Sequence, residues 1–375
     1  MDLIYFDHAA TTPVKEEVMK EMLPFFSTNY GNPSSIYSIG RRSKKAVETA
    51  RNKVAKAICG DDKEIFFTSC GSESDNLAIK GVAYANKEKG NHIITSKIEH
   101  PAVLNTCKSL EKEGFEVTYL NVDENGFVNL EELKNAIKDE TILISIMFAN
   151  NEIGTIQPIK EISNIAKSAN VIFHTDCVQA VGNVKIDVKN MEIDMLSMSA
   201  HKFYGPKGVG ALYVKDGVKF NKIQDGGHQE KNKRAGTENV AGIVGLGKAI
   251  EIANYNLENY NSKLLKLRNY FVREITNKFE NIKINGDLKQ RLPGNINISF
   301  PNIDGEELLL KLDSEGICAS AGSACSSGSL QPSHVLMAIG LDSQLANGSL
   351  RITFGEQNNI EEVKYLINTI ERIIG

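Results

Sequence analysis

The stretch MLSMSAHKFYGPKGVG, residues 195–210, joins a short apolar run to a glycine-rich turn and carries Lys202 between the two. The apolar run is typical of a buried strand, so Lys202 would lie at a strand end with its amine partly desolvated. Desolvation lowers the pKa of a lysine and frees its amine to act as a nucleophile. Ser199 and His201 add hydrogen-bond donors for an anionic group. Taken alone, the segment favours a simpler interpretation, a lysine on a turn before a strand at 210–214, and the rest of the chain must decide.

Upstream of this stretch, short apolar runs alternate with helical segments. Nearly continuous apolar strands separated by helices predict an α/β fold with a mostly parallel sheet covered by helices on both faces. Ligands of such sheets bind beyond the carboxyl ends of the strands. The predicted strands lie at 65–67, 92–94, 117–120, 142–148, 171–173 and 195–198.

Downstream, a helical stretch runs from Val240 to about Phe279, with a predicted interruption at 254–261. It leads into a second region that mixes strands and helices. The strand candidates there lie at 282–284, 295–300 and 350–354, and the helix candidates lie at 305–312, 333–339 and 360–374.

These patterns predict two domains. The larger one, residues 14–258, holds the mostly parallel sheet. The smaller α+β domain combines residues 1–13 and 259–375 and carries a loop at about 318–332.

The composition and net charge limit which classes of partner are expected. The 375 residues are 41% hydrophobic and 24% charged, with a net charge of -4, as in ordinary globular proteins. This charge gives no reason to expect nucleic acid or a membrane as a partner, and no segment is apolar enough to span a bilayer. The N-terminal residues do not resemble a signal peptide, so we expect a cytoplasmic protein. The six cysteines form no CxxC pair, which predicts free thiols, most of them buried, and neither a metal site nor disulfides.

Candidate site residues follow several of the predicted strands. Gly71 and Ser72 open a helix after the first strand, where backbone amides and a hydroxyl suit a phosphate, although Ser72 as an ordinary N-cap explains them equally well. Asp176 directly follows a buried strand, where a carboxylate is costly unless it meets a cation such as a protonated ring nitrogen, with Gln179 as a second polar contact. The alternative for Asp176 is an exposed turn.

Two further candidates rest on single side chains. His100 precedes Pro101 at a predicted helix start, a position suited to stacking on a planar ligand or to proton transfer, although a lone histidine is more often structural. Cys325 lies in a run of small residues, 320–330, that cannot build its own core. The run predicts a mobile loop with an exposed, reactive thiol; the alternative is an incidental cysteine in a linker.

Together, in their order along the chain, these motifs resemble the pyridoxal-phosphate-dependent cysteine desulfurases of the NifS/IscS-like group, with a long active-cysteine loop. The resemblance covers essentially the whole chain. The motifs are YFDHAATTP at 5–13, GNPSS at 31–35, TSCGSESDN at 68–76, EH at 99–100, NNEIG at 150–154, DCVQ at 176–179, SAHKFYGPKGVG at 199–210, RAGT at 234–237, GSAC at 322–325 and LRI at 350–352.

The resemblance implies an aspartate-aminotransferase-like fold, which is fold type I of the pyridoxal-phosphate-dependent transferases, and a homodimer with active sites at the interface. It implies that Lys202 binds the cofactor covalently and later removes a proton, and that Asp176 pairs with the ring nitrogen. Gln179 would contact the ring hydroxyl, and His100 would stack on the ring and handle protons. Cys325 would be the nucleophile that takes the sulfur.

The remaining implied roles concern anions. Asn151 and Arg351 would bind the carboxylate of the substrate, L-cysteine. The cofactor phosphate would be held by Gly71, Ser72, Ser199 and His201, joined by Thr237 from the partner subunit.

The implied activity converts L-cysteine to L-alanine, with the sulfur held as a persulfide on Cys325. A sulfur-acceptor protein, such as an iron-sulfur scaffold, would receive it for cluster assembly or tRNA thiolation. Two alternatives stay open: an enzyme of the same fold with another reaction, such as an aminotransferase or a selenocysteine-preferring lyase, and a non-catalytic scaffold that keeps only the fold.

Overall fold

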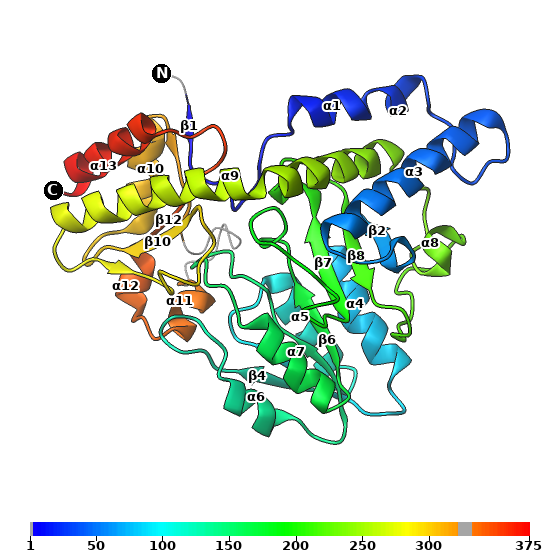
Figure 1. Ribbon diagram of the computed structural model, residues 1–375. Coiled ribbons are helices and arrows are strands. Elements are labelled where there is room, and N and C mark those ends of the chain that lie inside the picture. Colours follow the sequence, from blue (N-terminus) through cyan, green and yellow to red (C-terminus); the bar gives the residue numbers. More distant parts are fainter. Residues whose placement is uncertain (1–2, 322–331) are drawn as a thin grey trace.

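A seven-stranded sheet forms the centre of the larger unit of the molecule (Figure 1). The computed structural model describes residues 3–321 and 332–375. The strand order is β2-β8-β7-β6-β5-β3-β4, and only β8 runs antiparallel to its neighbours, which confirms the predicted mostly parallel sheet. The strands are β2 (Ile65–Thr68), β3 (His92–Ser96), β4 (Glu116–Leu120), β5 (Thr141–Ser145), β6 (Ile172–Asp176), β7 (Met195–Ser199) and β8 (Gly210–Val214).

Both faces of this sheet are buried, as predicted. Alternate side chains of one strand point to opposite faces: in β2, Phe66 joins one apolar cluster, whereas Ile65 and Phe67 join the other. This double burial explains why the strands are nearly continuous apolar runs. The covering helices are α3 (Ser38–Ala57), α4 (Gly71–Ala85), α5 (Pro101–Glu111), α6 (Leu130–Ala136) and α7 (Ile159–Ser168).

Shorter elements complete the larger unit. They are α1 (Glu16–Met22), α2 (Pro24–Ser27), α8 (Gln229–Asn232) and the 3-10 turns η1 (Asp62–Glu64) and η2 (Ala200–Lys202). Among the helices that the structure describes, none is long and apolar enough to cross a membrane.

The smaller unit is built on a three-stranded antiparallel sheet of order β12-β10-β9. A separate parallel pair joins β1 (Ile4–Tyr5), at the N-terminus, to β11 (Ile317–Cys318). Both chain ends lie at this unit (Figure 1). Its other elements are β9 (Lys283–Ile284), β10 (Asn295–Ser299), β12 (Ser349–Thr353), α10 (Gly305–Ser314), α11 (His334–Ala338), α12 (Ser343–Asn347) and α13 (Ile360–Ile374).

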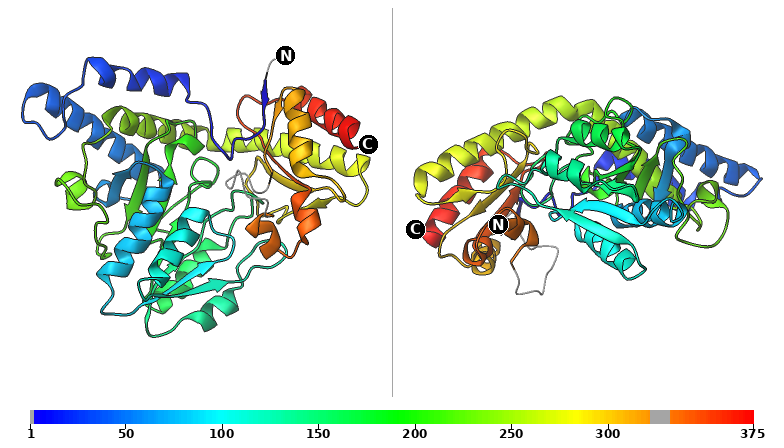
Figure 2. Two further views of the ribbon diagram at one scale, coloured as in Figure 1. Left: turned by 180° about the vertical axis from the view of Figure 1, so that it is seen from behind. Right: turned by 90° about the horizontal axis from the view of Figure 1, so that it is seen from below.

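One helix, α9 (Val240–Lys278), connects the two units without a break. Figure 2 shows it from behind, running from the larger unit to the smaller one. The predicted interruption at 254–261 is therefore wrong. That segment is rich in asparagine, a poor helix former, but Leu257 is buried and Tyr260 packs on the apolar core of the smaller unit. The packing of Leu257 and Tyr260 outweighs the weak helix propensity of the asparagines.

The cysteines only partly match their prediction. The five in the described part of the chain are free thiols, but only Cys107 and Cys177 are buried. Cys325 lies outside the described residues.

Candidate active site

A cavity of about 260 Å³ lies beyond the carboxyl ends of the central strands, where a parallel sheet binds its ligands. Side chains far apart in the sequence meet there because their strands end at one edge of the sheet. Ten of the predicted site residues line it: Gly71, Ser72, His100, Asn151, Asp176, Gln179, Ser199, His201, Lys202 and Arg351.

Lys202 ends the turn η2, which follows the fully buried strand β7. Its amine donates hydrogen bonds to the carbonyl oxygens of Ala9, at 2.5 Å, and Ala10, at 2.8 Å. The N-terminal segment therefore holds the Lys202 amine at the cavity wall.

Asp176 is the last residue of β6 and is 6% exposed, so the interpretation as an exposed turn is wrong. One oxygen accepts the Val178 N–H at 2.8 Å. Burial raises the pKa of Asp176, and the Val178 N–H hydrogen bond and the charge of Lys202 oppose that shift. A cation bound beside Asp176 would offset its desolvation.

His100 caps helix α5, as its place before Pro101 predicts. Its Nδ1 accepts the Ala102 N–H at 3.1 Å, which assigns the proton of the neutral ring to Nε2. Burial, more than the nearby charge of Lys202, lowers the pKa of His100. The ring is therefore neutral near pH 7 and lines the cavity.

The wall opposite these groups is the start of α4. The helix begins at Gly71 after the capping residue Cys70, so Ser72 lies inside the first turn and the N-cap interpretation is wrong. A Cβ on Gly71 would lie 2.6 Å from Cγ2 of Val178, which leaves no room for any side chain there. First-turn amides beside such a close backbone approach suit a phosphate.

His201 lies across from the start of α4. Its Nδ1 lies 3.1 Å from the Thr11 hydroxyl. Burial and the charges of Lys202 and Lys207 lower the pKa of His201 to about 4, so it would meet an anion as a neutral hydrogen-bond partner.

Arg351 lies in β12 of the smaller unit and is 2% exposed. Its Nη2 pairs with Asp7 Oδ1 at 2.8 Å, and its Nη1 donates to the Asn151 carbonyl at 3.2 Å. Its buried Nε has no hydrogen-bond partner among the described residues. A guanidinium with a spare donor at the cavity suits a carboxylate ligand.

Sequence reasoning assigned no role to three acids at this site. Asp7, Asp75 and Glu99 all lie within quoted motifs, but their burial and contacts depend on the fold. Asp75 lines the cavity and is 1% exposed, and its Oδ1 has no hydrogen-bond partner among the described residues. Burial and the charge of Asp176 raise the pKa of Asp75 well above its ordinary value, so it holds a proton where Asp176 is ionised.

One predicted residue is not brought to the cavity. Thr237 lies exposed on the segment before α9 and is not among the lining residues. Cys325 lies outside the described residues.

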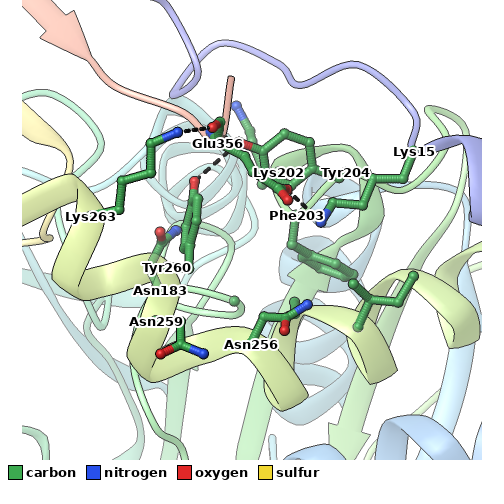
Figure 3. A pocket seen from close by; sticks show the side chains of 13 residues that line it. Lys15, Asn183, Lys202, Phe203, Tyr204, Asn256, Asn259, Tyr260, Lys263 and Glu356 are labelled. Carbon is green, nitrogen blue, oxygen red and sulfur yellow. Dashed lines mark hydrogen bonds and ion pairs between the residues drawn. The ribbon is translucent and has the colours of Figure 1, made fainter. Parts of the chain in front are cut away.

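A larger cavity of about 440 Å³ is also lined by Lys202 (Figure 3). Its charged groups are already paired: Lys15 with the Glu356 carboxylate, and Lys263 with the Glu356 carbonyl. Tyr204 and Tyr260 lie with their hydroxyls 3.2 Å apart. The smaller cavity, where buried polar atoms lack partners, is therefore the better candidate for catalysis.

The smaller cavity fits pyridoxal phosphate. The cofactor carries a phosphate for the Gly71 cradle, a basic ring nitrogen for Asp176 and an aldehyde for the Lys202 amine. Each of these groups would meet a lining residue of matching chemistry.

Comparison with known proteins agrees with this site. The family model "Aminotransferase class-V" matches residues 4–366. The chain is 60% identical to "Cysteine desulfurase IscS" of Clostridium botulinum strain Hall and 55% identical to that of Dictyoglomus turgidum, and both matches cover 99% of this chain and 94% of the relative.

Solved structures agree as well. A "NifS-like protein" superposes with a TM-score of 0.94 at 42% identity and 99% coverage of both chains. "SspA in complex with cysteine" gives 0.84 at 39% identity, over 94% of this chain and 99% of that one. The chain belongs to the aminotransferase class-V family, whose enzymes depend on pyridoxal phosphate.

Proposed function

We propose that this protein is a cysteine desulfurase that converts L-cysteine to L-alanine and holds the sulfur as a persulfide on Cys325. The observation that carries the proposal is the meeting of Lys202, Asp176 and Arg351 at one cavity. The full-length similarity to proteins named cysteine desulfurase supports it.

The residues of the larger unit would hold the cofactor. Lys202 binds it covalently, Asp176 pairs with its ring nitrogen, Gln179 contacts its ring hydroxyl and His100 stacks on the ring. When bound, pyridoxal phosphate supplies an electron sink for the carbon that bears the substrate amine. The phosphate would lie in the cradle formed by Gly71, Ser72, Ser199 and His201.

Arg351 and Asn151 would orient the substrate by its carboxylate. This fixes the Cα–H bond relative to Lys202, whose released amine Nζ takes the Cα proton. His100 is neutral and carries its proton on Nε2, so it can donate that proton within the cavity.

Cys325 would take the sulfur. Its thiolate attacks the sulfur of the bound cysteine, so that an S–S bond forms as the C–S bond breaks. Protonation of the carbon left behind gives L-alanine, and the sulfur stays on Cys325 as a persulfide.

Cys325→Ala separates this proposal from an aminotransferase of the same fold. The variant should lose protein-bound persulfide and most sulfide release from L-cysteine while keeping the visible absorbance of the lysine-bound cofactor. An aminotransferase would be nearly indifferent to the change.

Lys202→Ala tests the anchor itself. It should abolish both that absorbance and turnover, and retained turnover would contradict the assigned role. A scaffold without catalysis would show no such absorbance in the unmodified protein, even after pyridoxal phosphate is added.

We further propose a homodimer in which Thr237 reaches the phosphate of the partner subunit. Its exposure away from the cavity of its own chain supports this arrangement. Thr237→Ala should weaken cofactor binding, and mixing it with Lys202→Ala protein should form heterodimers with one intact site.

We propose that the persulfide passes to an acceptor protein, such as an iron-sulfur scaffold, in the cytoplasm. The free thiols of the five described cysteines fit a reducing compartment. Capture of persulfide acceptors from native lysate, with Cys325→Ala as the control, tests the transfer.

A further inference from the structure

The N-terminal segment Asp7–Thr12 contacts active-site residues from both units. Ala9 and Ala10 accept hydrogen bonds from Lys202, Ala9 also accepts one from Gln179, and Thr11 and Thr12 contact His201. Asp7 makes the corresponding contact in the smaller unit, with Arg351. The segment is thus part of the active-site wall, although no role in the reaction has been given to it so far.

Asp7 is held in place by the backbone around it. The carbonyl of the flanking residue Phe6 accepts a hydrogen bond from the Thr353 N–H at 2.7 Å. Asp7 itself forms an isolated parallel β-bridge with Thr353, the last residue of strand β12. Arg351 lies two residues earlier in that strand. The Asp7 side chain is 17% exposed and that of Arg351 2%, so the pair is largely buried next to the cavity that Arg351 lines.

Asp7 is the only carboxylate within ion-pair distance of Arg351 in residues 3–321 and 332–375. The pair is therefore neutral before substrate arrives. Asp7 accepts a hydrogen bond from Nη2 and the Asn151 carbonyl accepts one from Nη1, whereas the buried Nε–H has no partner among the described residues.

A substrate carboxylate that binds Arg351 would join this neutral pair as a second anion. Two carboxylates on one guanidinium repel each other, and the repulsion is strong where water is excluded. Without the Asp7 charge, the same carboxylate would meet an unpaired buried cation and bind more tightly.

We propose that Asp7 is a positioning residue that acts through Arg351 as its resident counter-ion and limits the affinity of the site for the carboxylate of substrate and product. The inference rests on the proposed function, in which Arg351 binds that carboxylate. Its consequence for the reaction is easier release of L-alanine, because the product carries the same carboxylate as the substrate.

Asp7→Asn in the cofactor-loaded protein tests this inference. The asparagine oxygen can still accept the Arg351 hydrogen bond, so the variant removes the charge and keeps the contact. Binding is measured by titrating the absorbance of the bound cofactor with L-alanine and with ethylamine, which is L-alanine without its carboxylate. We expect the dissociation constant of L-alanine to fall about tenfold and that of ethylamine to stay unchanged.

Thermal unfolding gives a readout independent of turnover. Cofactor-free Asp7→Asn protein should melt several degrees lower than the unmodified protein, because a buried cation has lost its counter-ion. In the loaded protein, saturating L-alanine should raise the melting temperature more in the variant than in the unmodified protein. Asp139→Asn, which removes the same charge from an exposed turn, is the matched control and should change neither quantity.

Unchanged or weaker L-alanine binding in Asp7→Asn would overturn the inference, as would an equal effect on ethylamine. If Asp7→Asn alone is too unstable to purify, Arg351→Gln and the Asp7→Asn/Arg351→Gln double variant decide. Without the guanidinium, the Asp7 carboxylate would still repel the carboxylate of L-alanine, so the double variant should bind L-alanine more tightly than Arg351→Gln, and equal affinities would overturn the inference. A failure of the desulfurase proposal would appear separately, as absence of alanine and persulfide formation from L-cysteine in the unmodified protein.

Discussion

Glu99 is fully buried. It directly precedes His100, which lines the catalytic cavity. Its carboxyl accepts a hydrogen bond from the Ser96 hydroxyl at 2.5 Å and two contacts from the Met147 N–H at 3.0 Å. Burial raises the pKa of Glu99 from 4.5 to about 8. The acid is therefore largely protonated in the folded protein at neutral pH and ionised in the unfolded chain.

This difference predicts the pH dependence of folding. Below about pH 4.5 both states are protonated; between pH 4.5 and about 8 the folded state binds more protons, so the free energy of unfolding falls as pH rises. One proton corresponds to a slope of up to about 1.4 kcal/mol per pH unit. In cofactor-free protein, Glu99→Gln should remove that slope. Urea unfolding at pH 5, 6, 7 and 8 measures this slope, and substitution of the exposed Glu124, Glu124→Gln, is the control. If the free energy of unfolding depends on pH in the same way in Glu99→Gln and in the unmodified protein, the prediction is wrong.

For single residues, the sequence predicted which side chains belong to the candidate site better than it predicted their burial and contacts. Lys202, Asp176 and His100 were identified because each follows a recognisable strand or precedes a recognisable helix. Asp7 and Glu99 were not, because the partners that give them a role lie hundreds or tens of residues away: Arg351 for Asp7, and the Met147 N–H for Glu99.

At the scale of elements, the start of α4 is tightly constrained. Gly71→Ala would push a methyl group to 2.6 Å from Val178 Cγ2, and the branched valine side chain has little freedom to move away. Since the first turn of α4 is the proposed phosphate cradle, the variant should bind pyridoxal phosphate about tenfold more weakly. Equilibrium titration of cofactor-free protein measures this. Gly71→Ala/Val178→Ala should recover most of the affinity; no recovery would rule out the steric explanation.

The turn at α8 is an element that no local pattern predicted. Glu230, Lys231 and Asn232 all have positive φ, a costly backbone conformation for residues other than glycine. The Glu230 carboxylate holds the turn in place through two hydrogen bonds to Arg51, at 2.7 and 2.8 Å, and one from the Phe67 N–H. The contacts that anchor Glu230 come from segments distant in the sequence, so the sequence alone could not indicate them.

Breaking that anchor should be costly. Glu230→Gln removes the buried carboxylate partner of the Arg51 guanidinium and leaves it only the exposed Glu48 carboxylate, so we expect a loss of about 3 kcal/mol in the free energy of unfolding. Denaturant unfolding measures the loss. Glu131→Gln, which breaks an exposed pair with Lys134, should have almost no effect. Equal effects of the two substitutions would show that the anchor does not stabilise the turn.

Across the whole molecule, the proposed site draws on both units. The proposed cofactor residues that line the cavity lie between Gly71 and Lys202, as does Asn151, whereas Arg351 lies in the smaller sheet. The sequence predicted both sheets because their strands have clear apolar patterns. It did not predict that α9 is continuous, because local propensity at 254–261 is weak and packing decides.

The predicted boundary at residue 258 falls inside α9, and we propose it as the division between two separately packed domains. One apolar core groups Phe6 with most buried apolar residues of 264–370, which supports the division, whereas Leu292 packs in a core of the larger unit and residues 335–346 pack on Ile98, Met147 and Ile153. The segment 1–13 then belongs to the smaller domain by its packing and to the active site by its contacts.

The continuous α9 predicts how the two units depend on each other. Tyr255 is 88% exposed and lies in α9, so Tyr255→Pro would break the helix with little loss of packed side chain. The cofactor absorbance should persist, whereas L-alanine binding should weaken at least tenfold because Arg351 is no longer held over the site. Titration of both ligands measures this, with Tyr255→Ala as the control. Equal losses of cofactor and L-alanine binding would contradict it.

The pairing of β1 with β11 has a practical consequence for protein engineering. Ile4 and Tyr5 lie in register with Ile317 and Cys318, and Asp7 follows directly at the wall of the catalytic cavity. An affinity tag or fusion partner attached before β1 would therefore begin next to strand β11, its partner in the sheet. The exposed Gly375, after helix α13, makes only a capping contact with Glu371, so purification tags belong at that end.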